Sequence, residues 1–299
     1  MRFTAPWGDT VRHWTIVGLI VVLAGLFGAT GRAHAQQPVP ADHYTLDPRG
    51  VDLITGSFNY STTDVVIGQP NSGGLIYGRT YTIEGWRDNF AGGISTIGTD
   101  KVVSIGPISE TFVVSGSGWV SKYSNGSTYV LSGAFVIITD KDGNQATFDQ
   151  IGGSDSNPYG ATEGLIRSYS SPSGEITTYN YGVGSKCIRM ALGGRCIVST
   201  PIYRISSVTN NYGYMIKYQY WSDVDTVDQW YRVKTVTGIN TAIDYCDPVA
   251  NSCSGFTRTW PSASYDNVQW YRNLSVTDQS GRVIAYTYGP TGMIHTVRA

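Results

Sequence analysis

Short runs of alternating apolar and polar residues follow one another along most of the chain, separated by Gly, Asn, Asp and Ser. Successive side chains of a β-strand point to opposite faces of a sheet, so such runs indicate half-buried strands. A representative stretch is RISSVTNNYGYMIKYQY at 204–220, in which a Val-Thr pair, a turn and two tyrosines two apart follow in order. It predicts a β-hairpin whose turn uses Asn and Gly, and whose two tyrosines share one face.

The same pattern returns in RNLSVTDQSGRVIAYTY at 272–288, with every interval kept. Weaker copies begin near Ile138, Pro172 and Val236, and 294–297 begins a further copy. Each unit is one supersecondary element that must bury its apolar face against a neighbour. Because the spacing between units is irregular, an array of hairpins with loops is expected instead of a strict solenoid. No convincing amphipathic helix pattern is present after residue 35.

The motif V-T-[ND]-x-x-G followed by Y-x-Y resembles the YD repeats of RHS-type proteins, and 208–220 and 276–288 carry it. The preceding region is similar to the opening segment of long RHS chains through five short motifs: 50–53, 55–56, 63–64, 79–81 and 85–87. The resemblance implies an all-β fold in which antiparallel β-hairpins form a curved, open sheet. In full-length family members that sheet closes into a hollow shell, which in polymorphic toxins and insecticidal toxin complexes encloses a toxic C-terminal domain.

The chain departs from that family pattern in one respect. Its D-P-x-G string, 47–50, precedes the repeats, where it is interpreted as a turn, whereas the family's autoproteolytic plug follows them. The resemblance therefore implies an RHS-type β region at 36–130 and a YD-repeat sheet at 131–299 whose last repeat is incomplete. Such a chain is expected to be the N-terminal part of a polymorphic-toxin shell. Its unpaired last strand is expected to cause self-association.

Residues 1–35 are predicted to be a signal peptide. Arg2 and Arg12 precede an apolar run at 14–28, and Ala33-His34-Ala35 is a small-residue cleavage site. The predicted location is secreted, periplasmic or cell envelope, with no stable membrane insertion after cleavage. Cleavage removes three of 21 basic residues and one of 22 acidic residues, which leaves 18 and 21, a net charge of −3. A balance of this kind argues against nucleic-acid binding.

Four cysteines form two close pairs, Cys187 with Cys196 and Cys246 with Cys253. An even number of cysteines in an exported chain favours disulfides, and pairing of nearest neighbours is expected. Each bridge would close a short loop between repeats. A four-cysteine zinc site is not favoured, because C-x-x-C spacing is absent.

Candidate chemistry is sparse. His43 and His295 remain after cleavage, at opposite ends of the chain, and neither lies near a G-x-S-x-G motif. The acidic clusters 140–144 and 223–228 lack the Glu that completes a calcium loop, and 140 is also the turn position of a repeat. We therefore predict no catalytic residues, metal or cofactor, and a chain that is not an enzyme. An enzyme of unrecognised type is a third hypothesis, motivated by the Asp clusters and the exported location.

The predicted function is that of an exported, non-catalytic RHS/YD-repeat protein with a structural or cell-envelope interaction role, its partner a cell-surface glycan or protein. The alternative is a secreted carbohydrate-binding module. It is motivated by the aromatic content, because an exposed aromatic platform stacks against sugar rings. Trp221 and Trp260 lie outside the repeat template and are the candidate glycan-binding residues. Tyrosines at template positions are instead expected to fill the sheet face and pair across strands.

Overall fold

The computed structural model describes residues 59–82, 85–106, 108–150, 163–191, 193–225, 228–269, 272–289 and 294–298. The predicted signal peptide at 1–35, His43 and the motifs at 50–56 lie outside these residues. Residues 35–299 form one compact unit. No helix in the described part of the chain is long and apolar enough to cross a membrane.

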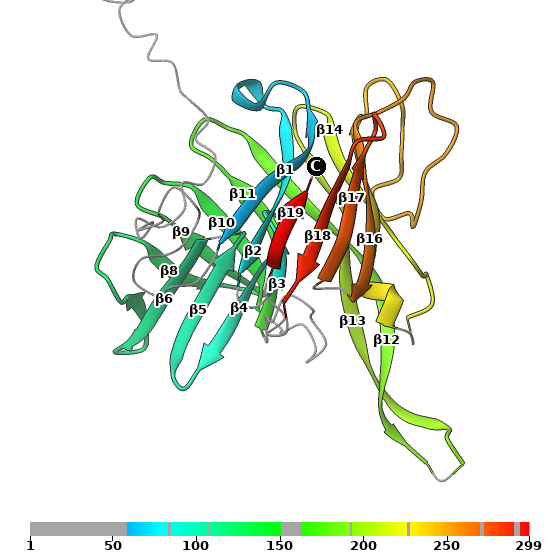
Figure 1. Ribbon diagram of the computed structural model, residues 1–299. Coiled ribbons are helices and arrows are strands. Elements are labelled where there is room, and N and C mark those ends of the chain that lie inside the picture. The colour runs from blue at the N-terminus through cyan, green and yellow to red at the C-terminus, as the bar shows by residue number, and fades with distance from the viewer. Residues whose placement is uncertain are drawn as a thin grey trace, which may run out of the picture. The chain divides into compact units, whose positions relative to one another are not determined.

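The described residues form nineteen β-strands and two short 3-10 helices, in the order shown in Figure 1. The first eight strands are β1 (Tyr60–Ile67), β2 (Leu75–Thr82), β3 (Gly85–Asp88), β4 (Gly92–Ile97), β5 (Asp100–Ile105), β6 (Ile108–Ser115), β7 (Gly118–Ser121) and β8 (Thr128–Ser132). The next six are β9 (Phe135–Thr139), β10 (Gln145–Asp149), β11 (Glu163–Ser170), β12 (Ile176–Met190), β13 (Cys196–Asn210) and β14 (Tyr214–Tyr220). The last five are β15 (Val233–Asn240), β16 (Ser262–Gln269), β17 (Arg272–Asp278), β18 (Val283–Tyr288) and β19 (Ile294–Arg298); the helices are η1 (Pro70–Ser72) and η2 (Asp228–Tyr231).

The strands form two sheets, and every pairing is antiparallel. β1, β2 and β3 form a three-stranded sheet, and the other sixteen strands form one large sheet in which most neighbours in sequence are neighbours in space. The prediction of an all-β array of antiparallel hairpins is confirmed. The boundary predicted between 130 and 131 falls inside β8, so the large sheet continues across it.

Part of the large sheet closes on itself, which adds to the open sheet expected from the sequence. β10 pairs with β9 and also with β11, so β4 to β11 form a ring of eight strands. One edge of β11 pairs with β10. Along the other edge, Glu163 and Leu165 pair with β4, and residues 168–170 pair with β12. β11 is therefore the strand at which the closed part joins the remaining strands, β12 to β19.

The repeat turns share one hydrogen-bonding pattern. The Oδ1 atom of Asn210 accepts from the amides of Tyr212 and Tyr214, and Oδ1 of Asp278 accepts from the amides two and four residues on. Gly213 and Gly281 then have φ angles of +83° and +84°, which L-residues rarely adopt. The Asn/Asp and Gly of the sequence motif are thus required by the same turn in both strong copies.

Both tyrosines of a repeat lie on one sheet face, as predicted. The rings of Tyr218 and Tyr220 are stacked, with centroids 6.3 Å apart and planes 15° apart. Tyr218 packs edge-on against Tyr77 of β2, whose ring centroid is 5.6 Å away. This face of the large sheet therefore lies against the three-stranded sheet, and the repeat tyrosines fill the space between the two.

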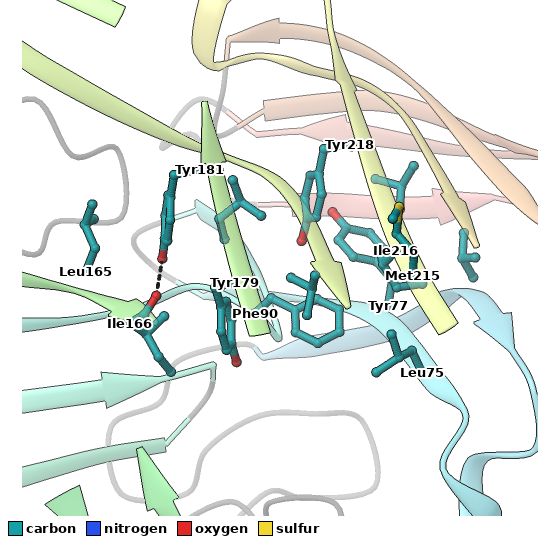
Figure 2. Packing of buried hydrophobic residues seen from close by; sticks show 14 of the residues in the cluster. Leu75, Tyr77, Phe90, Leu165, Ile166, Tyr179, Tyr181, Met215, Ile216 and Tyr218 are labelled. Atoms are coloured by element: carbon teal, nitrogen blue, oxygen red, sulfur yellow. Dashed lines mark hydrogen bonds between the residues drawn. The ribbon is translucent and has the colours of Figure 1, made fainter. Parts of the chain in front are cut away.

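Figure 2 shows part of this core. The rings of Tyr179, Phe90, Tyr77 and Tyr218 lie in sequence, with successive centroids 6.2, 6.5 and 5.6 Å apart. The weaker repeat copy that begins at Val236 has Gly238 directly after its Val-Thr pair. The core explains this glycine, because a Cβ atom on Gly238 would lie 2.8 Å from Cβ of Ile67. Glycine at that position lets β15 approach β1 closely.

Candidate functional site

The outer edge of β19 is the first candidate site. β19 pairs with β18 through Ala285–Arg298, Tyr286–Val297, Thr287–Thr296 and Tyr288–Ile294. Its other edge pairs with no strand among the described residues. Exposed edges of this kind present unpaired N–H and C=O groups that accept a further strand. The partial repeat predicted at 294–297 is thus formed as a strand, and it leaves an edge available.

The position of β19 is fixed by its inner face. Ile294 and Tyr288 are half-buried and pack against the core, and the hydroxyls of Thr287 and Thr296 form a 2.5 Å hydrogen bond across the pair. His295 is exposed on the same strand. Packing of Ile294 and the Thr287–Thr296 hydrogen bond therefore hold β19 against β18.

A buried polar centre lies between the two sheets. The Arg79 guanidinium binds Asp64 through Nε and Nη2, and the two side chains are 4% and 3% exposed. Tyr265 donates a 2.9 Å hydrogen bond to Asp64, while the guanidinium carbon lies 4.2 Å from the Trp86 ring centroid. Asp64 and Arg79 come from β1 and β2, so the ion pair lies within the small sheet, and the hydrogen bond from Tyr265 of β16 connects it to the large one.

A cavity of about 60 Å³ adjoins this centre, lined by Tyr77, Arg79, Trp86, Arg87, Asp88, Tyr231, Val233, Tyr265, Asn267 and Asn273. Burial raises the pKa of Asp88 to about 6, although the amides of Phe90 and Ala91, the Tyr218 hydroxyl and Arg79 oppose the rise. The cavity is large enough for a few water molecules. The motif at 79–81 gives no sign in the sequence that Arg79 is a buried charge, because its partners Tyr265 and Tyr286 are distant in sequence.

The two candidate glycan-binding tryptophans have different environments. Trp221 is 45% exposed, and Nζ of Lys234 lies 5.4 Å from its ring centroid. Trp260 is 8% exposed and donates a 2.8 Å hydrogen bond from Nε1 to Asp244. The expectation that both indoles are exposed is therefore wrong for Trp260, because the Asp244 carboxylate satisfies its polar atom within the loop that precedes β16. Because Trp260 is buried, it cannot form an exposed platform together with Trp221.

Both disulfides have the pairing expected from the spacing. Cys187 is bonded to Cys196 with a Cα–Cα distance of 5.7 Å, and Cys246 to Cys253 with 5.8 Å. The first lies near the end of the β12–β13 hairpin, and the second closes a loop between β15 and β16.

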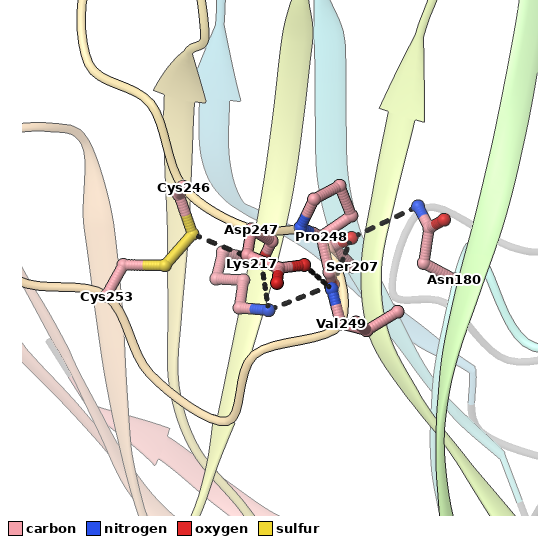
Figure 3. Close-up of a disulfide and its surroundings, with 8 residues drawn as sticks. All are labelled: Asn180, Ser207, Lys217, Cys246, Asp247, Pro248, Val249 and Cys253. Carbon is pink, nitrogen blue, oxygen red and sulfur yellow. Dashed lines mark hydrogen bonds between the residues drawn. A yellow bond between two sulfur atoms is a disulfide. The ribbon is translucent and has the colours of Figure 1, made fainter.

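The second disulfide loop is held against the sheet by buried polar side chains (Figure 3). Nζ of Lys217 donates to the carbonyl oxygens of Asp247 and Pro248, at 3.2 and 3.0 Å, and Ser207 donates to the Pro248 carbonyl at 2.8 Å. Burial lowers the pKa of Lys217 to about 8. Lys217 and Ser207 are cross-strand partners, and both donate to backbone carbonyls, which is an anchoring role.

The acidic clusters are occupied by structural hydrogen bonds. Oδ1 of Asp140 accepts from the amides of Asp142 and Asn144, as in the other repeat turns. Asp223 accepts from Arg204, and Asp225 accepts from the amide of Ser185 at 2.6 Å. Among the residues that the structure describes, no group of three or more His, Cys, Asp or Glu side chains is arranged to hold a metal ion.

Comparison with protein-family models finds no match, and comparison with curated proteins finds none either. Among solved structures, the chain is similar to a chain of a mutant Tc holotoxin pore from Photorhabdus luminescens. The TM-score is 0.43 and the sequence identity 12%, and the match covers 81% of this chain and 16% of that chain.

Proposed function

We propose that this chain is an exported structural module of the RHS/YD-repeat type, which continues its sheet by pairing the outer edge of β19 with a further strand. The observation that supports this most is the repetition of one hairpin geometry up to an edge that no described strand covers. Each repeat packs its tyrosines on the same face, so a further strand would extend the same core.

The role of the three-stranded sheet is to complete that core. A hairpin with one apolar face is marginal on its own and needs a second layer or neighbour. β1 packs against β14, β15 and β16, and β3 packs against β17, so the small sheet covers the tyrosine face of several units. We infer that it supports the start of a longer array, as the opening region of a polymorphic-toxin shell would.

An extended chain tests the proposal. β19 corresponds to the first strand of a repeat, so a copy of residues 278–288 (DQSGRVIAYTY) placed after the chain supplies a turn and a second strand. We expect amide hydrogen exchange in 294–298 to slow by at least about tenfold, because strand pairing protects edge amides from solvent. A control extension has the same length, with both tyrosines and the glycine replaced by serine. Equal exchange in the two extended chains would contradict the proposal.

A further inference from the structure

The β12–β13 hairpin is much longer than the sheet that holds it. β12 and β13 pair with each other from Thr177–Asn210 to Met190–Cys196. β11 pairs only with 176–178 of β12, and β14 only with 207–209 of β13. Within the described residues, the segment between these contacts is a two-stranded ribbon without further strand partners, and it extends away from the neighbouring strands (Figure 1). We refer to residues 183–201 as the ribbon.

The ribbon is basic in a chain that is otherwise slightly acidic. It contains Lys186, Arg189 and Arg195 and no Asp or Glu, a charge of +3, whereas residues 36–299 carry −3. All three side chains are exposed, and no ion pair found among the described residues includes them. The positive charge of the ribbon is thus available to an anionic partner.

Large apolar side chains are exposed beside these cations. Val183, Met190 and Ile197 are 66%, 65% and 50% exposed. Cations mixed with exposed apolar side chains are characteristic of surfaces that lie in the interface of an anionic bilayer, where the charges meet headgroups and the apolar groups enter the acyl boundary. A soluble acidic partner would account for the cations but not for the apolar residues.

The ribbon is also constrained at both ends. The Cys187–Cys196 disulfide joins its strands near the tip, where Gly193 and Gly194 have φ angles of +94° and +80°. At its base, Asp225 accepts the amide of Ser185, and a Cβ atom on Gly184 would lie 2.9 Å from Trp230. The three cations therefore lie on a conformationally restrained hairpin. Binding through it costs less conformational entropy than binding through a flexible loop.

We propose that the ribbon docks on an anionic lipid bilayer, with Lys186, Arg189 and Arg195 at the headgroups and Met190 and Ile197 in the acyl boundary. This proposal does not depend on strand addition at β19. It concerns a different element and a partner of different chemistry.

Vesicle cosedimentation tests it, with residues 36–299, which contain the described fold and lack the apolar run at 14–28. The vesicles are phosphatidylcholine alone or mixed with phosphatidylglycerol. We expect binding to the mixed vesicles that is lost at high salt. The triple variant Lys186→Gln, Arg189→Gln, Arg195→Gln should bind on the order of a hundredfold more weakly, since each cation near an anionic surface contributes about fivefold.

The matched control changes the same net charge elsewhere on the surface. Lys122→Gln, Lys141→Gln and Arg282→Gln alter three exposed cations outside the ribbon, and this variant should bind like the wild type. The double variant Met190→Ser, Ile197→Ser should weaken binding by about tenfold, because apolar surface no longer leaves water. Its circular dichroism should stay unchanged, since both side chains are exposed.

Four results would overturn the proposal. They are absence of binding to the mixed vesicles, equal binding to phosphatidylcholine alone, equal losses in the two charge variants, and full binding by the double variant. The last result, together with loss in the ribbon charge variant, would show that headgroup charge alone carries the binding and that Met190 and Ile197 do not enter the acyl boundary.

Discussion

The hydroxyl of Tyr220 donates a 2.6 Å hydrogen bond to the carbonyl oxygen of Ile205, fifteen residues earlier on the partner strand of its hairpin. Tyr288 with Asn273 and Tyr181 with Ile166 repeat this bond at 2.7 and 2.9 Å, also across fifteen residues. The hydroxyl of the second tyrosine in each Y-x-Y pair therefore hydrogen-bonds the strand after the turn to the backbone of the strand before it. This bond explains why the interval between glycine and tyrosine is kept, because one inserted residue would move the hydroxyl to the other face.

Removing one of these hydroxyls should cost measurable stability. Tyr220→Phe keeps the ring but leaves the Ile205 carbonyl without the hydroxyl donor, and we expect the free energy of unfolding to fall by about 1 kcal/mol. Tyr288→Phe should cost more than Tyr220→Phe, because the Tyr288 hydroxyl also accepts a 3.0 Å hydrogen bond from Nε1 of Trp86. Tyr245→Phe is the control, since that side chain is 79% exposed. Equal urea-denaturation midpoints for Tyr220→Phe and Tyr245→Phe would refute this role.

The turn glycines should be sensitive to a side chain for conformational reasons alone. A Cβ on Gly281 would meet no heavy atom within 4 Å, yet its φ is +84°. Gly281→Ala should lower the free energy of unfolding by about 1–2 kcal/mol, and Gly281→Asn by less, because Asn tolerates left-handed backbone better.

Gly118→Ala provides the comparison for that measurement. Gly118 also has open space at its Cβ position but has no positive φ. We expect no loss of stability in thermal unfolding. If Gly118→Ala were as destabilising as Gly281→Ala, the left-handed conformation would not be the cause.

Asp88 should make the stability depend on pH. Burial raises its pKa from an ordinary value of 3.8 to about 6, so the folded state binds a proton more tightly than the unfolded chain does. The contribution of this group is therefore most favourable below pH 4 and declines as the pH rises to 6, by on the order of 3 kcal/mol.

The variant Asp88→Asn isolates that contribution. It cannot ionise and retains an oxygen that accepts from Phe90, as Oδ1 of Asp88 does at 2.9 Å. Relative to wild type, it should gain stability between pH 4 and pH 7. Asp142→Asn, at an exposed side chain, is the control substitution. A constant difference between wild type and Asp88→Asn over this range would exclude the raised pKa.

The Arg79–Asp64 pair should be costly to break from one side. Arg79→Met leaves a buried carboxylate without its cation, and we expect a loss of about 3–5 kcal/mol. Adding Asp64→Leu should recover about 2 kcal/mol, since it removes the unpaired charge. A double-mutant cycle in urea measures this coupling, and strictly additive losses would show that the two residues act independently.

The hairpins could be predicted because their information is local. Val-Thr, Asn210 or Asp278, the turn glycine and the tyrosines fall within seventeen residues, and turn chemistry with period-two alternation decides their arrangement. The same local logic covers the disulfides, since Cys187 and Cys196 are nine residues apart in sequence.

Long-range features could not be predicted from these patterns. Ring closure depends on β10 meeting β11 while β11 also pairs with β4, and no short motif encodes that choice. Arg79 reaches Tyr286, 207 residues away, at 3.5 Å. Burial of Trp260 depends on Asp244, which lies in a loop without periodicity. Ring closure, the Arg79 contacts and the burial of Trp260 all depend on which distant segments meet in space. The local sequence around a Trp or an Arg does not show whether the residue will be buried or exposed.

The central claim is that the outer edge of β19 accepts another strand, and sedimentation velocity of residues 36–299 over a range of concentrations tests it most directly. We predict a sedimentation coefficient that rises with concentration as edges of two copies pair. Because amides alternate in direction along a strand, either Thr296→Pro or Val297→Pro should abolish this rise without weakening the β18–β19 pair. A single, concentration-independent monomer coefficient for the unmodified chain would contradict the account.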